Sequence, residues 1–303
     1  MPRPPVDIVV PFLGGDTELR DLLVRLRAIR RESADTLTVV DNRPGGAAPD
    51  GDVIRAPERQ SSYFARNRGV ARGGAEWIVF LDADVEPAAD LLERYFEVPP
   101  GERAGVLAGG VEATAAPGGG LVTRFGVLQR HLEVAGDDGP GGRGHALTAN
   151  LAVRRAAFDA VGGFADDIRS GGDADLCFRI QDAGWALERR AAARVSHATR
   201  ATLPALLRAF LRYGSGAQWL SERYPGFQPP GSLPRVLAAV LATAVRVPRA
   251  AARGGRDAAL VAALEPLCGL AFELGRFLPN RVGGGWGDTL RHVRHARAAR
   301  KRG

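Results

Sequence analysis

The chain has 303 residues and a net charge of +7, with 45% hydrophobic and 25% charged residues. This composition excludes a wholly disordered chain, a collagen-like repeat and a polytopic membrane protein, and the length fits one large domain or two small ones. The charge is unevenly distributed, because residues 200–303 carry 17 Arg+Lys against 5 Asp+Glu, whereas residues 1–199 carry 24 against 29. We therefore expect the C-terminal part to face an anionic partner.

Strands and helices alternate along the N-terminal part of the chain. Apolar, β-branched runs predict the strands, and the spacing of the apolar residues predicts the helices between them. The expected strands are 6–12, 37–40, 53–54, 77–81 and 105–111, and the expected helices are 17–30, 61–73 and 87–96. Strands that are joined through helices form a mainly parallel sheet covered on both faces.

The predicted secondary structure changes twice in the rest of the chain. Five glycines between 136 and 144 predict a loop, which short helices at 154–161 and 173–183 and a strand at 187–195 follow. Beyond residue 200 the sequence is rich in Ala, Leu and Arg and predicts helices at 203–213, 233–245, 257–277 and 289–300. We therefore divide the chain into an α/β domain, residues 1–199, and a basic helical region, residues 200–303.

The cysteines and the hydropathy of the sequence indicate in which cellular compartment the protein is expected. Cys177 and Cys268 both lie in apolar, helical patterns, so we expect reduced core residues in a cytoplasmic protein. The apolar run at 8–13 is too short for a signal peptide. No stretch of about 18 uncharged apolar residues predicts a spanning helix.

Two aspartates follow the most apolar of the expected strands. Asp82 and Asp84 come directly after 77–81 and are separated by one residue. In extended backbone such side chains face the same side, and they would lie at the carboxyl end of the strand, where open α/β sheets bind ligands. Two hard oxygen ligands suit Mg²⁺ or Mn²⁺ beside substrate phosphates. The alternative is that both residues only begin the next helix.

Six segments in chain order resemble the family 2 glycosyltransferases, which are inverting enzymes of GT-A fold that use nucleotide sugars. These segments are 9–12 (VVPF), 39–42 (VVDN), 65–71 (ARNRGVA), 82–84 (DAD), 150–155 with 162–164, and 172–179 (GDADLCFR). The resemblance covers residues 6–200 and continues weakly to Gly226. It implies a GT-A-type, Rossmann-like domain with nucleotide-sugar binding and catalysis in 1–199.

The resemblance also implies roles for the matching residues. Asp41 would bind the nucleobase, and His197 would join the two aspartates as a third metal ligand. The residues implied to bind the nucleotide sugar are Pro11, Phe12, Asp41, Arg66, Asn67, Asp82, Ala83 and Arg200; those implied to bind metal are Asp82, Asp84 and His197. Taken without the resemblance, Asp41 is nearly as well explained as a turn residue, and an arginine such as Arg66 as a solvated helix residue.

Asp173 is predicted to be the catalytic base. Direct displacement needs one carboxylate to take the proton of the acceptor hydroxyl. Asn150 and Asp175 are expected on the acceptor side. Gly172 departs from the family pattern, which usually has Glu before this aspartate, and it leaves the base open between Asp173 and Asp175. A helix N-cap is the structural alternative for Asp173.

The basic C-terminal helices allow two interpretations. They either lie on an anionic membrane surface or pack as a helical extension with solvated arginines. We favour the extension for 203–250 and membrane contact for 257–302, where the arginines from 291 to 302 recur about every third residue. Nucleic acid is not expected, because no aromatic residues are interleaved with the basic ones in the way that single strands need.

These observations predict a metal-assisted inverting glycosyltransferase. The donor would be a nucleotide diphosphate sugar, UDP-linked by resemblance, and Mn²⁺ or Mg²⁺ would assist. The acceptor would be a lipid, an envelope glycan or a small metabolite, and the protein would be cytoplasmic, with a peripheral position at the membrane if the basic helices bind it. The alternatives are an inactive protein of the same fold that binds nucleotide sugars or anionic surfaces, and a nucleotidyltransferase. The latter would carry a basic, Gly-rich loop after the first strand, which 12–16 lacks.

Overall fold

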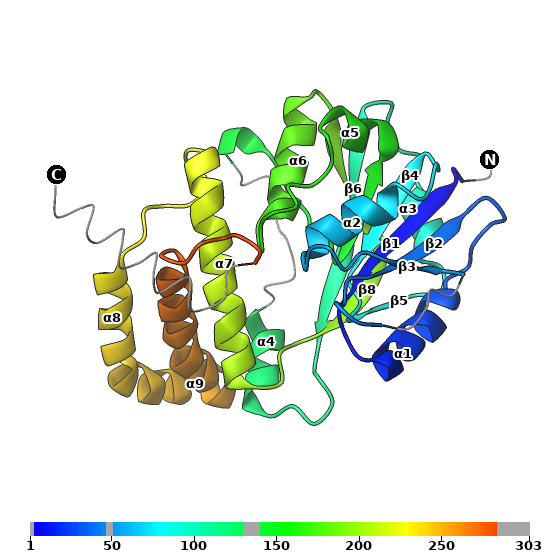
Figure 1. Cartoon of the computed structure of the whole chain (residues 1–303). Helices are drawn as coiled ribbons and strands as arrows, with labels where there is room; N and C mark the ends of the chain where they lie inside the picture. Colours follow the sequence, from blue (N-terminus) through cyan, green and yellow to red (C-terminus); the bar gives the residue numbers. More distant parts are fainter. Residues whose placement is uncertain (1–2, 47–50, 130–139, 284–303) are drawn as a thin grey trace. The chain divides into compact units, whose positions relative to one another are not determined.

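The computed structural model describes residues 3–46, 51–129 and 140–283. Contacts between residues divide the chain into two compact units (Figure 1). The first contains 1–115, 130–167 and 172–199, and the second contains 116–129, 168–171 and 200–303. The predicted helix at 289–300, its basic residues and the part of the Gly-rich loop at 136–139 lie outside the described residues.

One mixed sheet of eight described strands organises the first unit, in the order β3-β2-β1-β4-β7-β6-β8-β5. The pairs β1–β2, β2–β3, β1–β4 and β6–β8 are parallel, and the pairs β4–β7, β6–β7 and β5–β8 are antiparallel. The strands are β1 (Val6–Phe12), β2 (Thr36–Asp41), β3 (Val53–Arg55), β4 (Trp77–Leu81), β5 (Val85–Pro87), β6 (Ala104–Thr114), β7 (Asn150–Arg154) and β8 (Ala186–Ala198). The parallel pairing expected from the alternation of strands and helices is therefore confirmed for β1 to β4, whereas the antiparallel β7 was not predicted.

Helices cover both faces of this sheet. On one face, α1 (Asp16–Arg27) and α3 (Leu91–Phe96) share a buried apolar cluster with alternate residues of β1, β2 and β4. On the other face lie α2 (Ser62–Val70), α5 (Arg155–Ala160) and α6 (Gly172–Asp182). Gly69 allows α2 to approach closely, since a Cβ there would lie 2.4 Å from a methyl carbon of Val9. Both cysteines are free and buried, as expected.

Some element boundaries differ from those expected. The helix predicted at 87–96 begins only at Leu91, because the residues before it form β5 and pair with β8. The helix predicted at 203–213 continues to Arg223 as α7 (Leu203–Arg223). Gly214 is a contact point and not a helix stop, since a Cβ there would lie 1.9 Å from the carbonyl oxygen of Phe272.

The second unit is helical in its described part. It contains α4 (Leu121–Gln129), which was not predicted, α7, α8 (Leu233–Leu241) and α9 (Thr243–Gly275). Phe125, Leu206 and Cys268 form the buried centre where α4, α7 and α9 meet. Gly255, with φ of 71° and ψ of −158°, interrupts α9.

Helix α9 is long and apolar enough to cross a membrane by length and composition. An 18-residue window within it has a mean hydropathy of 1.6, and 28% of that window is buried. No such helix was expected from the sequence, because Glu265 and Pro266 interrupt the apolar run. Helices inside a bundle meet the same criterion, and α9 packs against α7, α8 and α4.

Candidate functional site

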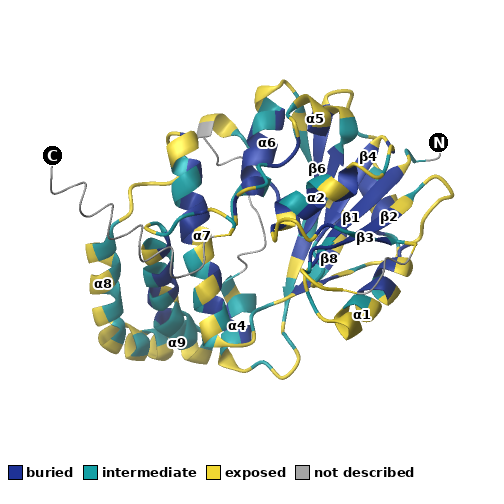
Figure 2. Cartoon of the chain, viewed as in Figure 1, coloured by how far each residue is buried: buried dark blue, intermediate teal, exposed yellow. Residues whose placement is uncertain are grey.

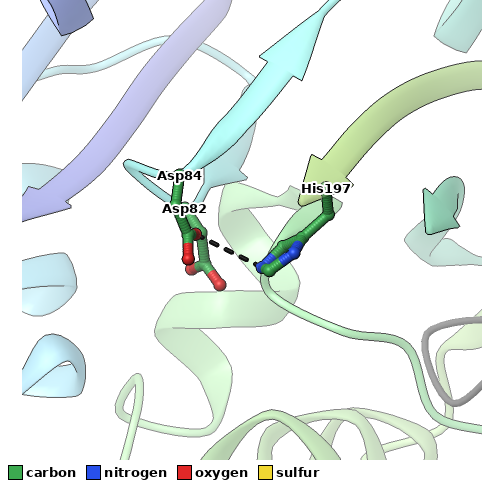
Figure 3. A group of neighbouring side chains, drawn as sticks. All are labelled: Asp82, Asp84 and His197. Carbon is green, nitrogen blue, oxygen red and sulfur yellow. Dashed lines mark ion pairs between the residues drawn. The ribbon is translucent and has the colours of Figure 1, made fainter. Parts of the chain in front are cut away.

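Three side chains from two strands meet at the carboxyl end of β4. Asp82 and Asp84 follow this fully buried strand, and His197 lies near the end of β8. Val85 pairs with His197 across β5 and β8, which brings the imidazole beside the two aspartates. One ligand atom from each of the three side chains lies within 4.8 Å of the others (Figure 3).

The imidazole of His197 is held with one nitrogen toward Asp84. Its Nδ1 lies 2.9 Å from the carbonyl oxygen of Ala198, which can only accept, so Nδ1 carries the proton of this hydrogen bond. Nε2 lies 3.3 Å from Oδ1 of Asp84 (Figure 3). In the neutral tautomer both of these atoms are acceptors, and two facing acceptors need a cation or a proton between them. Two carboxylates and one imidazole fit Mn²⁺ or Mg²⁺.

Arg66 on α2 is attached to this group. Its guanidinium donates a hydrogen bond to Oδ1 of Asp82, and only 3% of the arginine side chain is exposed. The guanidinium also lies over the rings of Tyr63 and Phe164, 5.6 and 6.0 Å from their centroids. Arg66 is therefore a buried residue that holds the carboxylate of Asp82, and not a solvated helix arginine.

Phe12 and Asp41 lie side by side at the ends of β1 and β2. Arg43 covers them, because its Nε and Nη2 donate to the two oxygens of Asp41 at 2.8 and 2.9 Å and its guanidinium lies 5.4 Å from the centre of the Phe12 ring. Burial by itself raises the pKa of the Asp41 carboxyl, but the hydrogen bonds from Arg43 outweigh it and hold that pKa below its ordinary value. Arg43 was missed in the sequence, where it reads as part of a turn.

Asn67 is used for local structure. Its amide nitrogen donates to the carbonyl oxygen of Phe164 at 2.9 Å, and its amide oxygen accepts from the Phe164 N–H at 3.0 Å. These two bonds fix the turn at Gly163, whose φ is +74°. Pro11 lies in β1, where it pairs with Val40. The carbonyl oxygen of Ala83 accepts from Nη2 of Arg25 at 2.9 Å.

The first turn of α6 presents two aspartates in different environments. The side chain of Asp173 is half-buried and accepts a hydrogen bond from the N–H of Ala174 at 3.1 Å. Asp175 is fully buried and pairs with Arg179 at 2.7 Å, and Arg179 also donates to the carbonyl oxygens of Val161 and Gly163. Asp175 is therefore engaged inside the protein, whereas Asp173 is partly open to solvent.

Tyr63 explains why residue 172 is a glycine. A Cβ at Gly172 would lie 2.7 Å from the Tyr63 ring, and the hydroxyl oxygen of Tyr63 accepts a hydrogen bond from the Gly172 N–H at 3.0 Å. The same ring stacks on Phe164, with centroids 5.4 Å apart. Tyr63 thus connects the start of α6 to Arg66 and Asp82. Sequence reasoning missed it, since an isolated tyrosine on a helix carries no motif.

A cavity of about 390 Å³ lies over the glycine segment of β6 and the residues that precede β7. Its lining includes Glu112, His145, Arg189 and Arg194 around Gly109 and Gly110. Asn150, predicted on the acceptor side, is fully buried beneath it. Its amide nitrogen donates to the carbonyl oxygens of Gly110 and Ala193 at 2.9 and 2.8 Å, and its oxygen accepts from the Tyr95 hydroxyl at 2.7 Å. Asn150 therefore holds the backbone of Gly110, which lines the cavity. Arg200 belongs to the second unit.

Residues 8–123 match the family model described as glycosyl transferase family 2. This part of the chain is therefore similar to that family. Its structure has the GT-A fold and resembles a mannosyltransferase of Pyrobaculum calidifontis, solved in complex with GDP-Man and Mn²⁺. The TM-score is 0.59 at 17% identity, and the match covers 90% of this chain and 87% of the other.

Two curated proteins to which this chain is similar are glycosyltransferases. It is 29% identical over 245 residues to the pre-mycofactocin glycosyltransferase of Mycobacterium tuberculosis, covering 74% of this chain and 50% of the relative. It is 32% identical over 136 residues to the glycosyltransferase AglE of Haloferax volcanii, covering 45% of this chain and 44% of the relative. The match thus spans half or less of the length of these relatives.

Proposed function

We propose that this chain transfers a sugar from a nucleotide diphosphate sugar to an acceptor hydroxyl, with inversion at the anomeric carbon. The observation that carries the proposal is the group of Asp82, Asp84 and His197 at the carboxyl end of β4 in a GT-A sheet. The resemblance to a mannosyltransferase that binds a nucleotide sugar with Mn²⁺ supports it. We further propose that the protein works in the cytoplasm, in agreement with its two free, buried cysteines.

Asp82, Asp84 and His197 would hold Mn²⁺ or Mg²⁺. When bound there, the ion supplies positive charge that neutralises the departing diphosphate. The chain itself prepares the site, because Arg66 orients one oxygen of Asp82 and Ala198 orients the imidazole.

The nucleotide would occupy the edge formed by β1, β2 and β4. Phe12 and Asp41, with Arg43 between them, form the side for the base, and Pro11 and Ala83 line the same ends of strands. Asn67 acts by fixing the turn at Phe164. We propose a UDP-linked donor.

Asp173 is the proposed general base. It is half-buried at the start of α6, and its carboxylate keeps acceptor capacity beyond the one bond to its own helix. The ion pair of Asp175 with Arg179 makes Asp175 a residue that holds the acceptor side in place.

The cavity over β6 would take the acceptor. Its volume of about 390 Å³ is of the size expected for a small-molecule group, and Arg189 and Arg194 favour an acceptor with an anionic group. A lipid phosphate, an acidic envelope glycan and an acidic small metabolite all meet this description.

Donor binding tests the proposed function directly. With UDP and Mn²⁺ at about a hundred times the dissociation constant, the native state gains roughly 2.7 kcal/mol, and the melting temperature rises by about 5 °C. GDP and dTDP serve as matched ligands, and EDTA removes the metal contribution. The absence of any nucleotide-dependent shift would contradict the proposal, and a larger shift with GDP would replace the UDP assignment.

Tyr63→Phe tests how α6 is positioned. The variant keeps the ring that contacts Arg66 but leaves the buried N–H of Gly172 without an acceptor, a loss of about 1–3 kcal/mol. We expect kcat of sugar transfer to fall about tenfold while KM for the donor stays unchanged, because the base moves and the donor site does not. Tyr213→Phe, at a half-exposed tyrosine of α7, is the control. A parallel rise in donor KM would show that Tyr63 acts on the donor and not on Asp173.

A further inference from the structure

Helix α8 and the first turns of α9, residues 233–256, form an exposed helical surface in the second unit. No residue of α8 is buried. Leu237 and Leu241 of α8 are 45% and 81% exposed, and Val245 in the first turn of α9 is 52% exposed. Figure 2 shows these turns in the colours of exposed and intermediate residues. The four-residue spacing of Leu237 and Leu241 places both side chains on one side of α8.

The same segment is strongly basic. Its charged residues are all exposed arginines: Arg235, Arg246, Arg249, Arg253 and Arg256. The first acidic residue beyond it, Asp257, pairs with Arg124 of α4. A segment with exposed apolar residues, five cations and no acid is typical of helices that lie at a membrane surface.

The rest of α9 is different, although the sequence favoured 257–302 for membrane contact. Among residues 257–275 only Glu265 and Leu274 are exposed, and Cys268 is buried against α4 and α7. The preference is therefore reversed for the part of the chain that the structure describes: residues 257–275 belong to the bundle, and residues 233–256 are exposed.

We propose that residues 233–256 bind the surface of an anionic lipid bilayer. The arginines meet acidic headgroups, and Leu237, Leu241 and Val245 enter the boundary with the acyl chains. A second copy of this chain is a poor partner, since five arginines would face five others. The C-terminal residues 284–303 are an equally poor partner for this surface, because they carry six cations and one acid and would repel its arginines. Nucleic acid would use the arginines but leave the apolar side chains in water.

Vesicle sedimentation with the full chain tests this surface. One set of vesicles is pure phosphatidylcholine, and in the other roughly one lipid in three is phosphatidylglycerol. We expect binding to the anionic vesicles only. The pairs Leu241→Asp with Val245→Asp, and Arg249→Glu with Arg253→Glu, are each expected to weaken binding at least about tenfold.

The control replaces matched residues of the first unit. Val24 on α1 is 72% exposed, and Arg31 is an exposed arginine, so Val24→Asp with Arg31→Glu changes the same residue types and is expected to bind like the unchanged protein. Three outcomes would each overturn the proposal. The protein binds both vesicle sets equally, the 233–256 variants bind vesicles like the unchanged protein, or those variants lose self-association although the chain binds no vesicles. The inference does not rest on sugar transfer, because the nucleotide-dependent thermal shift of every variant is expected to stay unchanged.

Discussion

Asp173→Asn is expected to lower the turnover of sugar transfer by about 10²–10⁴-fold while the nucleotide-dependent thermal shift stays intact. The substitution keeps the shape of the side chain and its hydrogen bond from the N–H of Ala174 but removes the basic oxygen. The donor is untouched, so only the step that takes the acceptor proton is lost. Release of nucleoside diphosphate from the donor sugar, with and without acceptor, measures the effect.

Two further variants on the same helix make this result specific. Asp182→Asn alters an exposed aspartate that pairs with Arg143, and we expect full activity. Asp175→Asn removes one partner of a buried ion pair and is expected to cost about 3–5 kcal/mol of folding free energy, which a melting curve detects. Unchanged turnover in Asp173→Asn would remove the proposed base. An unaltered protein that binds the donor but shows no turnover would instead favour an inactive binding protein of this fold.

Asp84→Ala is expected to abolish the dependence of donor binding on Mn²⁺. The side chain of Asp84 is 51% exposed and faces Nε2 of His197, so its removal takes away one ligand and disturbs little packing. Loss of a ligand is expected to weaken metal binding at least about a hundredfold, and turnover falls with it because the charge on the leaving diphosphate is no longer neutralised. Titration of Mn²⁺ in the presence of the nucleotide, followed by melting temperature, measures the change.

Glu86→Gln is the matched control, because Glu86 is an exposed acid two residues further on that does not belong to the group of Asp82, Asp84 and His197. His197→Asn provides a second variant of the group itself and is expected to weaken Mn²⁺ binding in the same direction. If Asp84→Ala keeps the same Mn²⁺ titration as the Glu86→Gln control, these three residues do not form the metal site.

Helix α2 contacts both the start of α6, which carries Asp173, and Asp82, which lies beside Asp84. Arg66 holds Asp82, and Tyr63, one turn earlier, accepts the hydrogen bond of Gly172 beside Asp173. Within α2, Tyr63 therefore acts on the start of α6 beside the proposed base, and Arg66 acts on the proposed metal ligand Asp82. The stacked contact of Tyr63 with Phe164 makes this arrangement rigid, since both rings are buried.

The sequence by itself determined the elements whose signal is local. The apolar run of β4 followed by Asp82 and Asp84 predicted a strand with two carboxylates at its end, because alternation along a strand depends only on neighbouring residues. Alternation of strands with helices likewise predicted the parallel pairing of β1, β2 and β4. Ordered short motifs predicted the resemblance to family 2 glycosyltransferases without any knowledge of contacts, and the family model matches residues 8–123.

Only the tertiary structure decided what depends on distant residues. The antiparallel β7, the pairing of Val85 with His197 and the contact of Tyr63 with Gly172 join segments far apart in the chain, and no local pattern encodes them. The close contact of Gly214 with the carbonyl oxygen of Phe272 likewise depends on a distant segment. Residues 233–256 carry five arginines and no acid, whereas residues 257–275 carry three acids and no arginine. The structure adds that 257–275 pack against α4 and α7, while 233–256 stay largely exposed. Composition sets which residues can leave water, but the packing partner decides which of them do.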